Sequence, residues 1–302
     1  MKKTLVLIAA AATMLATVSC KKDGVFNPKE KIHYVYTEAT TVTYESYNTN
    51  NPVAVDTAIT KQYKSQEYVW DGKKLTEIKY FDPKGDDLGS TKLTYDGKQL
   101  SKVESGKMTM TYNYKGSKLT TMEVMQNSES LMTIDVEHDG KKISKLTANI
   151  AAAAMENLDS LDLLFTKNAL KLAVPEKAAE ALVSQKSAKA SLSVSVTMTF
   201  TYEDKNLTKI DMSGVMGFAS GSMSFTYDNK KNPMQGCYAM FGPTALSQNN
   251  VVKTTMGTES DELKYTYNAD DYPETVTSTE WNEPEGNYKY EITTTQTYEY
   301  MD

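Results

Sequence analysis

A repeated segment built around an aromatic residue, an Asp-Gly turn and a leucine constrains this chain more than any other feature. The first copy, Tyr68 to Ile78, ends a strand at Trp70-Asp71-Gly72 and leaves through Leu75-Thr76-Glu77-Ile78. Self-similarity of this kind marks an architecture built from one supersecondary unit. Further copies run over 93–103, 112–122, 136–146 and 200–210, with shorter ones starting at Phe225 and Tyr265.

Each copy predicts one β-hairpin. Asp-Gly favours the positive φ that a two-residue hairpin turn requires. The exit places two apolar residues three positions apart, as with Leu75 and Ile78. Strict alternation would put these two on opposite faces, so the pattern predicts a β-bulge or a leucine tucked under the turn.

The fold class expected from these repeats is mainly β, an antiparallel up-and-down meander of hairpins. Alternation is clean from Leu192 to Tyr202, and again near the C-terminus, where Tyr288, Tyr290 and Ile292 share a face. A long meander leaves open edges unless it closes. We therefore expect a closed barrel, with an open curled sheet as the alternative.

One segment breaks the β pattern. Residues 151–190 are rich in Ala, Leu and Lys, and Pro175-Glu176 resembles the first turn of a helix. We expect a helical insertion between a first β half, 31–150, and a second, 191–302, within one domain.

The N-terminus predicts export and lipidation. Lys2 and Lys3 precede an uncharged run from Leu5 to Ala16, which suits a signal peptide and is too short to span a bilayer. Thr17-Val18-Ser19-Cys20 resembles the lipobox of bacterial lipoproteins, which implies cleavage after residue 19 and acylation of Cys20. We expect residues 20–30 to be a flexible tether to the membrane.

Composition limits the partners. The chain has a net charge of −6 and no arginine, which argues against nucleic acid. With Cys20 acylated, Cys237 has no partner for a disulfide. We expect the chain to need no cofactor.

The repeats together resemble a family of Bacteroidetes lipoproteins of unknown function with a porin-like fold. The resemblance rests on the Tyr-x-Asp-Gly-x-x-Leu-Thr-x-Ile copies, on 228–233 and on Tyr265 to Val276. It implies an outer-membrane lipoprotein on the periplasmic face or the cell surface, and it carries over no catalytic residue. Lys and Glu on the outward strand faces argue against a barrel that spans the bilayer.

Candidate chemistry is sparse. His33 and His138 have no metal-ligand spacing, and the acidic runs 82–87 and 270–271 lack the spacing of a calcium loop. We therefore predict no metal site and no assigned catalytic residue.

Three functions stay open at this point. The first is a non-catalytic module that binds a ligand such as a glycan, or an envelope protein, through aromatic side chains. The second is a polysaccharide hydrolase using Glu280, Glu283 and Glu285 beside Trp281. The third is a structural role in envelope assembly. The candidate binding residues are Trp70, Trp281, Tyr288 and Tyr290.

Overall fold

The computed structural model describes residues 28, 30–45, 53–151, 194–214, 221–236, 245–285 and 288–301. The signal peptide, Cys20, nearly all of the tether, the helical insertion (apart from Ala151) and Cys237 lie outside the described residues. Their predictions therefore stay predictions.

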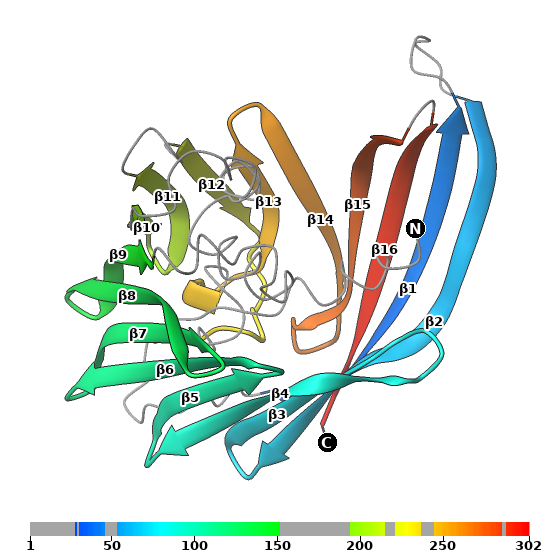
Figure 1. The fold of residues 1–302 in the computed structure, drawn as a ribbon. Helices are drawn as coiled ribbons and strands as arrows, with labels where there is room; N and C mark the ends of the chain where they lie inside the picture. Colours follow the sequence, from blue (N-terminus) through cyan, green and yellow to red (C-terminus); the bar gives the residue numbers. More distant parts are fainter. Residues whose placement is uncertain are drawn as a thin grey trace.

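Within the described residues, sixteen strands form a closed antiparallel barrel in which each strand pairs with its neighbours in sequence (Figure 1). The first strand pairs with the last, from Ile32 with Tyr300 to Glu45 with Tyr288, so the predicted closure is confirmed. The strands are β1 (Ile32–Glu45), β2 (Val53–Asp71), β3 (Lys74–Phe81), β4 (Asp87–Asp96), β5 (Gln99–Ser105), β6 (Met108–Lys115), β7 (Lys118–Gln126), β8 (Glu129–Asp139), β9 (Lys142–Ile150), β10 (Val194–Glu203), β11 (Asn206–Gly214), β12 (Gly221–Tyr227), β13 (Val251–Met256), β14 (Glu259–Tyr267), β15 (Pro273–Glu285) and β16 (Tyr288–Tyr300).

The turns of the repeats gather at one end of the barrel, which we call the motif rim. They are the two-residue turns 72–73, 97–98, 116–117, 140–141 and 204–205. Gly97 has φ 57° and Gly116 has φ 64°, as the Asp-Gly signal predicts. Because successive strands are antiparallel, β1 begins and β16 ends at this rim. At the opposite end, which we call the far rim, β1 and β15 end and β2 and β16 begin.

A bulge follows each of these turns, as the leucine spacing predicts. Trp70 pairs with Leu75 and Val69 with Glu77, which leaves Thr76 as the extra residue of β3. The Thr76 hydroxyl donates to the Val69 carbonyl across the hairpin at 3.1 Å. The Ser101, Thr120 and Thr208 hydroxyls make the same cross-hairpin contact in their copies.

The repeated aromatic residue ties several of the hairpins to the one before. Tyr95 donates to the Leu75 carbonyl at 2.9 Å, and Tyr114 donates to the Leu100 carbonyl at 2.9 Å. The repeat at β8 has His138 in the tyrosine position, and its Nε2 lies 2.8 Å from the Leu119 carbonyl oxygen. This histidine is therefore a half-buried strand residue.

A lysine at the start of the exit strand makes a second link between copies. Lys74 donates to the Gly97 carbonyl of the next turn at 2.7 Å and lies 5.4 Å from the centroid of the Tyr95 ring. Lys142 donates to the Asp204 carbonyl at 2.8 Å and lies 5.0 Å from the Tyr202 ring. The motif rim is thus a chain of repeated contacts that fixes the order of the hairpins.

One face of the repeat strands is apolar and buried, and the other is polar and more open to solvent. On β10, Val196, Met198 and Phe200 are at most 8% exposed, while Thr199 and Thr201 are exposed. The outward side of a one-layer wall stays open to solvent, so the apolar rows must point into the barrel. Within the described residues, no helix is long and apolar enough to cross a membrane.

Candidate binding surface

Four strands on one side of the barrel reach past their neighbours toward the far rim. We call this part the extension: residues 40–45 of β1, 53–61 of β2, 279–285 of β15 and 288–293 of β16. β3 pairs with β2 only from Gln66 onward, and β14 pairs with β15 only up to Ser278. The extension is therefore a four-stranded sheet that stands clear of the adjoining strands (Figure 1).

The strand register divides the extension into an inner and an outer face. Val35, Thr37 and Ala39 of β1 are at most 9% exposed, so their face is the inner one. Side chains that are paired across strands share a face. Trp281 pairs with Glu291, which pairs with Val42, so these three residues are on the outer face.

Trp281 is the centre of the outer face. Its side chain is 48% exposed, its ring lies 5.5 Å from that of Tyr44, and the Lys289 ammonium lies 4.1 Å from its centroid. The Tyr44 hydroxyl donates to Glu291 at 3.4 Å. Loss of hydration and the Glu291 carboxylate both raise the pKa of Tyr44. We call Tyr44, Trp281, Lys289 and Glu291 the aromatic cluster.

Paired hydroxyls lie beside the aromatic cluster on the same face. Thr279 and Thr293 have their Oγ1 atoms 3.1 Å apart, and Thr277 and Thr295 have theirs 3.0 Å apart. These side chains project from paired strand positions that the sheet holds in place. The outer face thus combines an aromatic end with rows of hydroxyls on a strand scaffold.

Two of the candidate residues, Tyr288 and Tyr290, face the other way. Tyr290 pairs with Thr43 and Tyr288 with Glu45, so both tyrosines lie on the inner face. Glu291, between them and Ile292 in sequence, lies on the outer face. Tyr288 is 41% exposed and Tyr290 is half-buried. The structure brings these two tyrosines together and separates them from Trp281.

Trp70 lies at the motif rim, far from Trp281. Its Nε1 donates to the Ile32 carbonyl at 2.9 Å, and the Lys31 ammonium lies 5.4 Å from its ring. These are the contacts that the tyrosines make in the other copies. Ile32 and Tyr44 are separated by most of β1, about 40 Å of strand at roughly 3.3 Å per residue. The structure therefore does not bring the two tryptophans into one platform.

Of the carboxylates proposed for hydrolysis, the one that the structure describes, Glu280, does not lie beside Trp281. Glu280 pairs with Ile292, which is 5% exposed on the inner face, so Glu280 and Trp281 project from opposite sides of β15. The side chains of Glu283 and Glu285 lie outside the described part of the chain.

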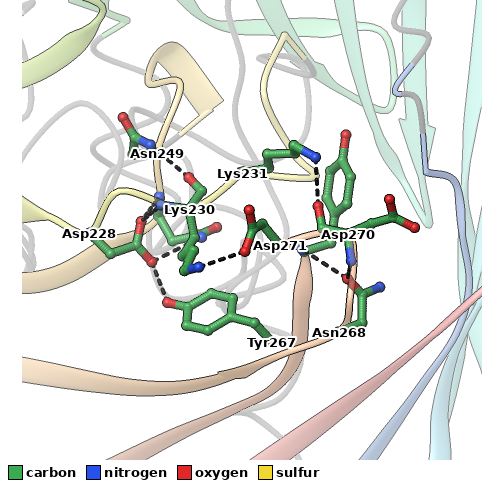
Figure 2. A network of polar contacts seen from close by, with 10 residues as sticks. Asp228, Lys230, Lys231, Asn249, Tyr267, Asn268, Asp270 and Asp271 are labelled. Carbon is green, nitrogen blue, oxygen red and sulfur yellow. Dashed lines mark hydrogen bonds and ion pairs between the residues drawn. The ribbon is translucent and has the colours of Figure 1, made fainter.

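A polar network at the motif rim joins the segment after β12 to the turn between β14 and β15 (Figure 2). Asp228 accepts from the backbone of Lys230 at 2.9 Å, from the backbone of Asn250 at 3.0 Å, from the Asn250 amide at 3.1 Å and from the Tyr267 hydroxyl. Burial and the bond to Asp228 raise the pKa of Tyr267. Because both oxygens of Asp228 accept bonds from within the chain, this carboxylate organises the loop.

The acidic pair 270–271 belongs to the same network. Asp271 pairs with the Lys230 ammonium at 2.5 Å, and this bond lowers the pKa of Asp271. The Lys231 ammonium donates to the Asp270 carbonyl at 2.6 Å.

The acidic run 82–87 also forms hydrogen bonds within its own loop. Asp82 Oδ1 accepts from the backbone of Lys84 and Asp86, both at 2.8 Å. Among the residues described, no three His, Cys, Asp or Glu side chains group as metal ligands would.

Sequence reasoning missed Tyr44, Lys289 and Glu291 as neighbours of Trp281. Tyr44 is more than two hundred positions away from Trp281 along the chain, and it becomes a neighbour only because β1 closes the barrel against β16. The available signal was the alternation of β16, which put Lys289 and Glu291 on one face.

Comparison with known proteins adds a likeness of fold only. No family model matches the chain, and no curated protein matches it. Among solved structures, a porin-like protein from Bacteroides uniformis ATCC 8492 is similar, with a TM-score of 0.48 and 10% identity over 92% of this chain and 100% of that chain.

Proposed function

We propose that this protein is a lipid-anchored component of the cell envelope that binds an envelope ligand, foremost a glycan, without catalysis. The observation that carries the proposal is the aromatic cluster, in which a half-exposed tryptophan lies beside a tyrosine and a lysine on an extension clear of the neighbouring strands.

The chemistry of the cluster suits a sugar. An aromatic ring offers an apolar face to the C–H side of a pyranose, and polar groups around it accept and donate hydrogen bonds. Here Glu291 and the Thr279–Thr293 pair supply such groups on the same face as Trp281. The scaffold is rigid strand rather than loop, which lowers the entropy lost on binding.

The direction of the extension is compatible with a lipid anchor on Cys20. The described chain enters β1 at the motif rim, and the aromatic cluster lies toward the other end of the same strand. A lipid on Cys20 would join the chain at its motif-rim end, which allows the extension to point away from the membrane.

The outer wall also favours an anchored barrel over one embedded in the bilayer. Ion pairs lie on the exposed faces of strands, for example Lys145 with Glu137 at 2.6 Å and Lys209 with Asp211 at 2.7 Å. A lysine on the lipid face costs about 2–4 kcal/mol at the bilayer midplane.

A glycan array probed with the full-length protein tests the binding proposal. We expect wild type to retain a defined set of oligosaccharides, and Trp281→Ala to lose at least about tenfold in affinity, or about 1.4 kcal/mol. Leu88→Ala is the control, because Leu88 is equally exposed at 49% on another strand. The proposal fails if wild type retains no glycan, or if both variants bind as wild type does.

The anchor is tested separately by mass spectrometry of the protein from its native membrane. We expect the mature chain to begin at residue 20 and to carry fatty acids there. Cys20→Ser should be recovered in the soluble fraction. A mature N-terminus without acyl chains removes the anchor and leaves the glycan proposal standing.

A further inference from the structure

The outer strand of the extension has an open edge. Residues 53–65 of β2 pair with β1 on one side, and β3 joins the other side only at Gln66. No other strand in the described part of the chain pairs with this edge. Residues 54–59 are all exposed, and Figure 1 shows β2 as the outermost strand of the extension.

Such an edge recognises another extended strand. Alternate residues present backbone N–H and C=O groups outward, and these pair with a neighbouring strand. The side chains favour the same partner, because Val55 is 47% exposed and Ile59 is 72% exposed. The run from Val53 to Thr60 is rich in β-branched residues, which have high strand propensity.

We propose that the occupant of this edge is a second copy of the chain, paired β2 to β2 in antiparallel orientation about a two-fold axis. Opposite residues must share a face, so the axis has to pass midway between the two copies of one residue. Choosing Ile59 as that residue buries the most exposed large apolar side chain of the described chain against its own copy.

Charge also favours this partner and this direction. Asp56 and Lys61 lie on either side of Ile59 and have opposite signs. An antiparallel copy brings the Asp56 end of each strand beside the Lys61 end of the other. Because Asp56 pairs with Thr43 and projects from the inner face, the attraction acts between the strand ends and not as a cross-strand ion pair. A parallel copy would bring like charges together, which destabilises strand pairing.

Two bulges limit the length of the ladder. The register of β2 against β1 shifts once between Asp56 and Ala54 and again between Tyr63 and Thr60. The regular stretch therefore runs from Asp56 to Thr60. Centred on Ile59, the proposed register pairs Ala58 with Thr60 and Ile59 with itself, and Lys61 at the edge of the second bulge lies opposite Thr57. Such bulges protect a natural edge from unlimited pairing, so we expect a reversible dimer rather than a fibre.

The dimer extends the sheet across two copies. Because the axis stands perpendicular to the sheet, the outer faces of both copies point the same way. Where the proposed glycan binding holds, two aromatic clusters then act on one polymer with higher avidity.

Disulfide trapping on the full-length protein tests this pairing. Opposite Cα atoms of antiparallel strands are about 4.5–5.5 Å apart, which is within the range of a disulfide. We expect Ile59→Cys to form a covalent dimer on mild oxidation. Leu88→Cys is the matched exposed control, and wild type reports the background from Cys20 and Cys237. Non-reducing gels and intact mass give the readout.

Light scattering coupled to size exclusion provides a second readout without a cysteine. We expect wild type to shift from monomer to dimer with concentration, and Ile59→Lys to weaken the dimer at least about tenfold. Circular dichroism and melting should show both variants folded, since Ile59 packs little in the monomer. Three results would overturn the proposal: no more dimer from Ile59→Cys than from Leu88→Cys, an Ile59→Lys dimer as strong as wild type, or a trapped species that contains a different chain.

Discussion

The motif rim and the extension are built from the same strands but use their side chains differently. At the motif rim the repeated residues bond to backbone or fill the core, as Tyr95 does with the Leu75 carbonyl and Leu75 does at 0% exposure. On the extension Ile59 and Trp281 remain 72% and 48% exposed. The repeated residues of this chain therefore stabilise the fold. Binding residues are expected on the extension, which contains no copy of the repeat.

The sharpest contrast between the two regions should come from apolar truncation. Leu75→Ala removes a fully buried side chain from the wall and should cost about 2–5 kcal/mol of unfolding free energy. Ile59→Ala on the extension should change it by less than about 0.5 kcal/mol at monomer concentrations. Urea unfolding measures both. Equal losses of unfolding free energy would show that Ile59 on the extension is packed as tightly as Leu75 near the motif rim.

The next largest effect should be a loss of barrel stability at alkaline pH. Burial raises the pKa of Tyr227 to about 12 and also raises that of Tyr265. These phenols bind their protons more tightly in the folded state, so their stabilisation is complete below an unfolded pKa of about 10. It should fall as pH rises from about 10 to 12. Tyr227→Phe and Tyr265→Phe should each flatten this fall, and an unchanged pH profile in both variants would contradict the burial.

Glycine substitution separates a motif turn from an ordinary strand position. Gly97→Ala places a Cβ at φ 57° and should cost about 1–2 kcal/mol, although no atom lies within 4 Å of that Cβ. Gly221 on β12 has equal space and no positive φ. Gly221→Ala should therefore be neutral or stabilising by about 0.4–1 kcal/mol. Melting curves of the two variants should move in opposite directions, and a common shift would mean that the turn geometry is wrong.

The smallest effect should come from single hydroxyls. Tyr95→Phe leaves the Leu75 carbonyl without its donor and should cost about 1 kcal/mol. Tyr44→Phe removes a bond of 3.4 Å on the extension and should cost less than about 0.5 kcal/mol. Denaturant midpoints resolve this difference. A larger loss of stability from Tyr44→Phe than from Tyr95→Phe would contradict the proposed difference between the motif rim and the extension.

Much of the barrel of hairpin repeats could be predicted from sequence, because the sequence signals for turns and bulges are local. Asp-Gly sets each turn, and the three-residue spacing of Leu75 and Ile78 signals each bulge. Closure was also predictable, because a long meander avoids open edges by joining its ends. The roles of Thr76 and of the aromatic position were missed, since a side-chain bond to a neighbouring backbone leaves no trace in periodicity.

The candidate site was only partly predictable, for a physical reason. Trp281 was identified, but its neighbours depend on which strands meet when the barrel closes. Alternation placed Tyr288 and Tyr290 on one face correctly, yet the face that Trp281 shares follows from the β15–β16 register. The bulges shift such registers by one residue, and a shift of one residue exchanges the faces.

Hydrogen exchange with and without the glycan that ranks highest on the array tests the central claim most directly. The central claim is that the motif rim holds the fold and the outer face of the extension binds. We expect ligand protection confined to residues 40–45, 279–285 and 288–293, with exchange at turns 97–98 and 116–117 unchanged. Protection at those turns, with none on the extension, would contradict the claim.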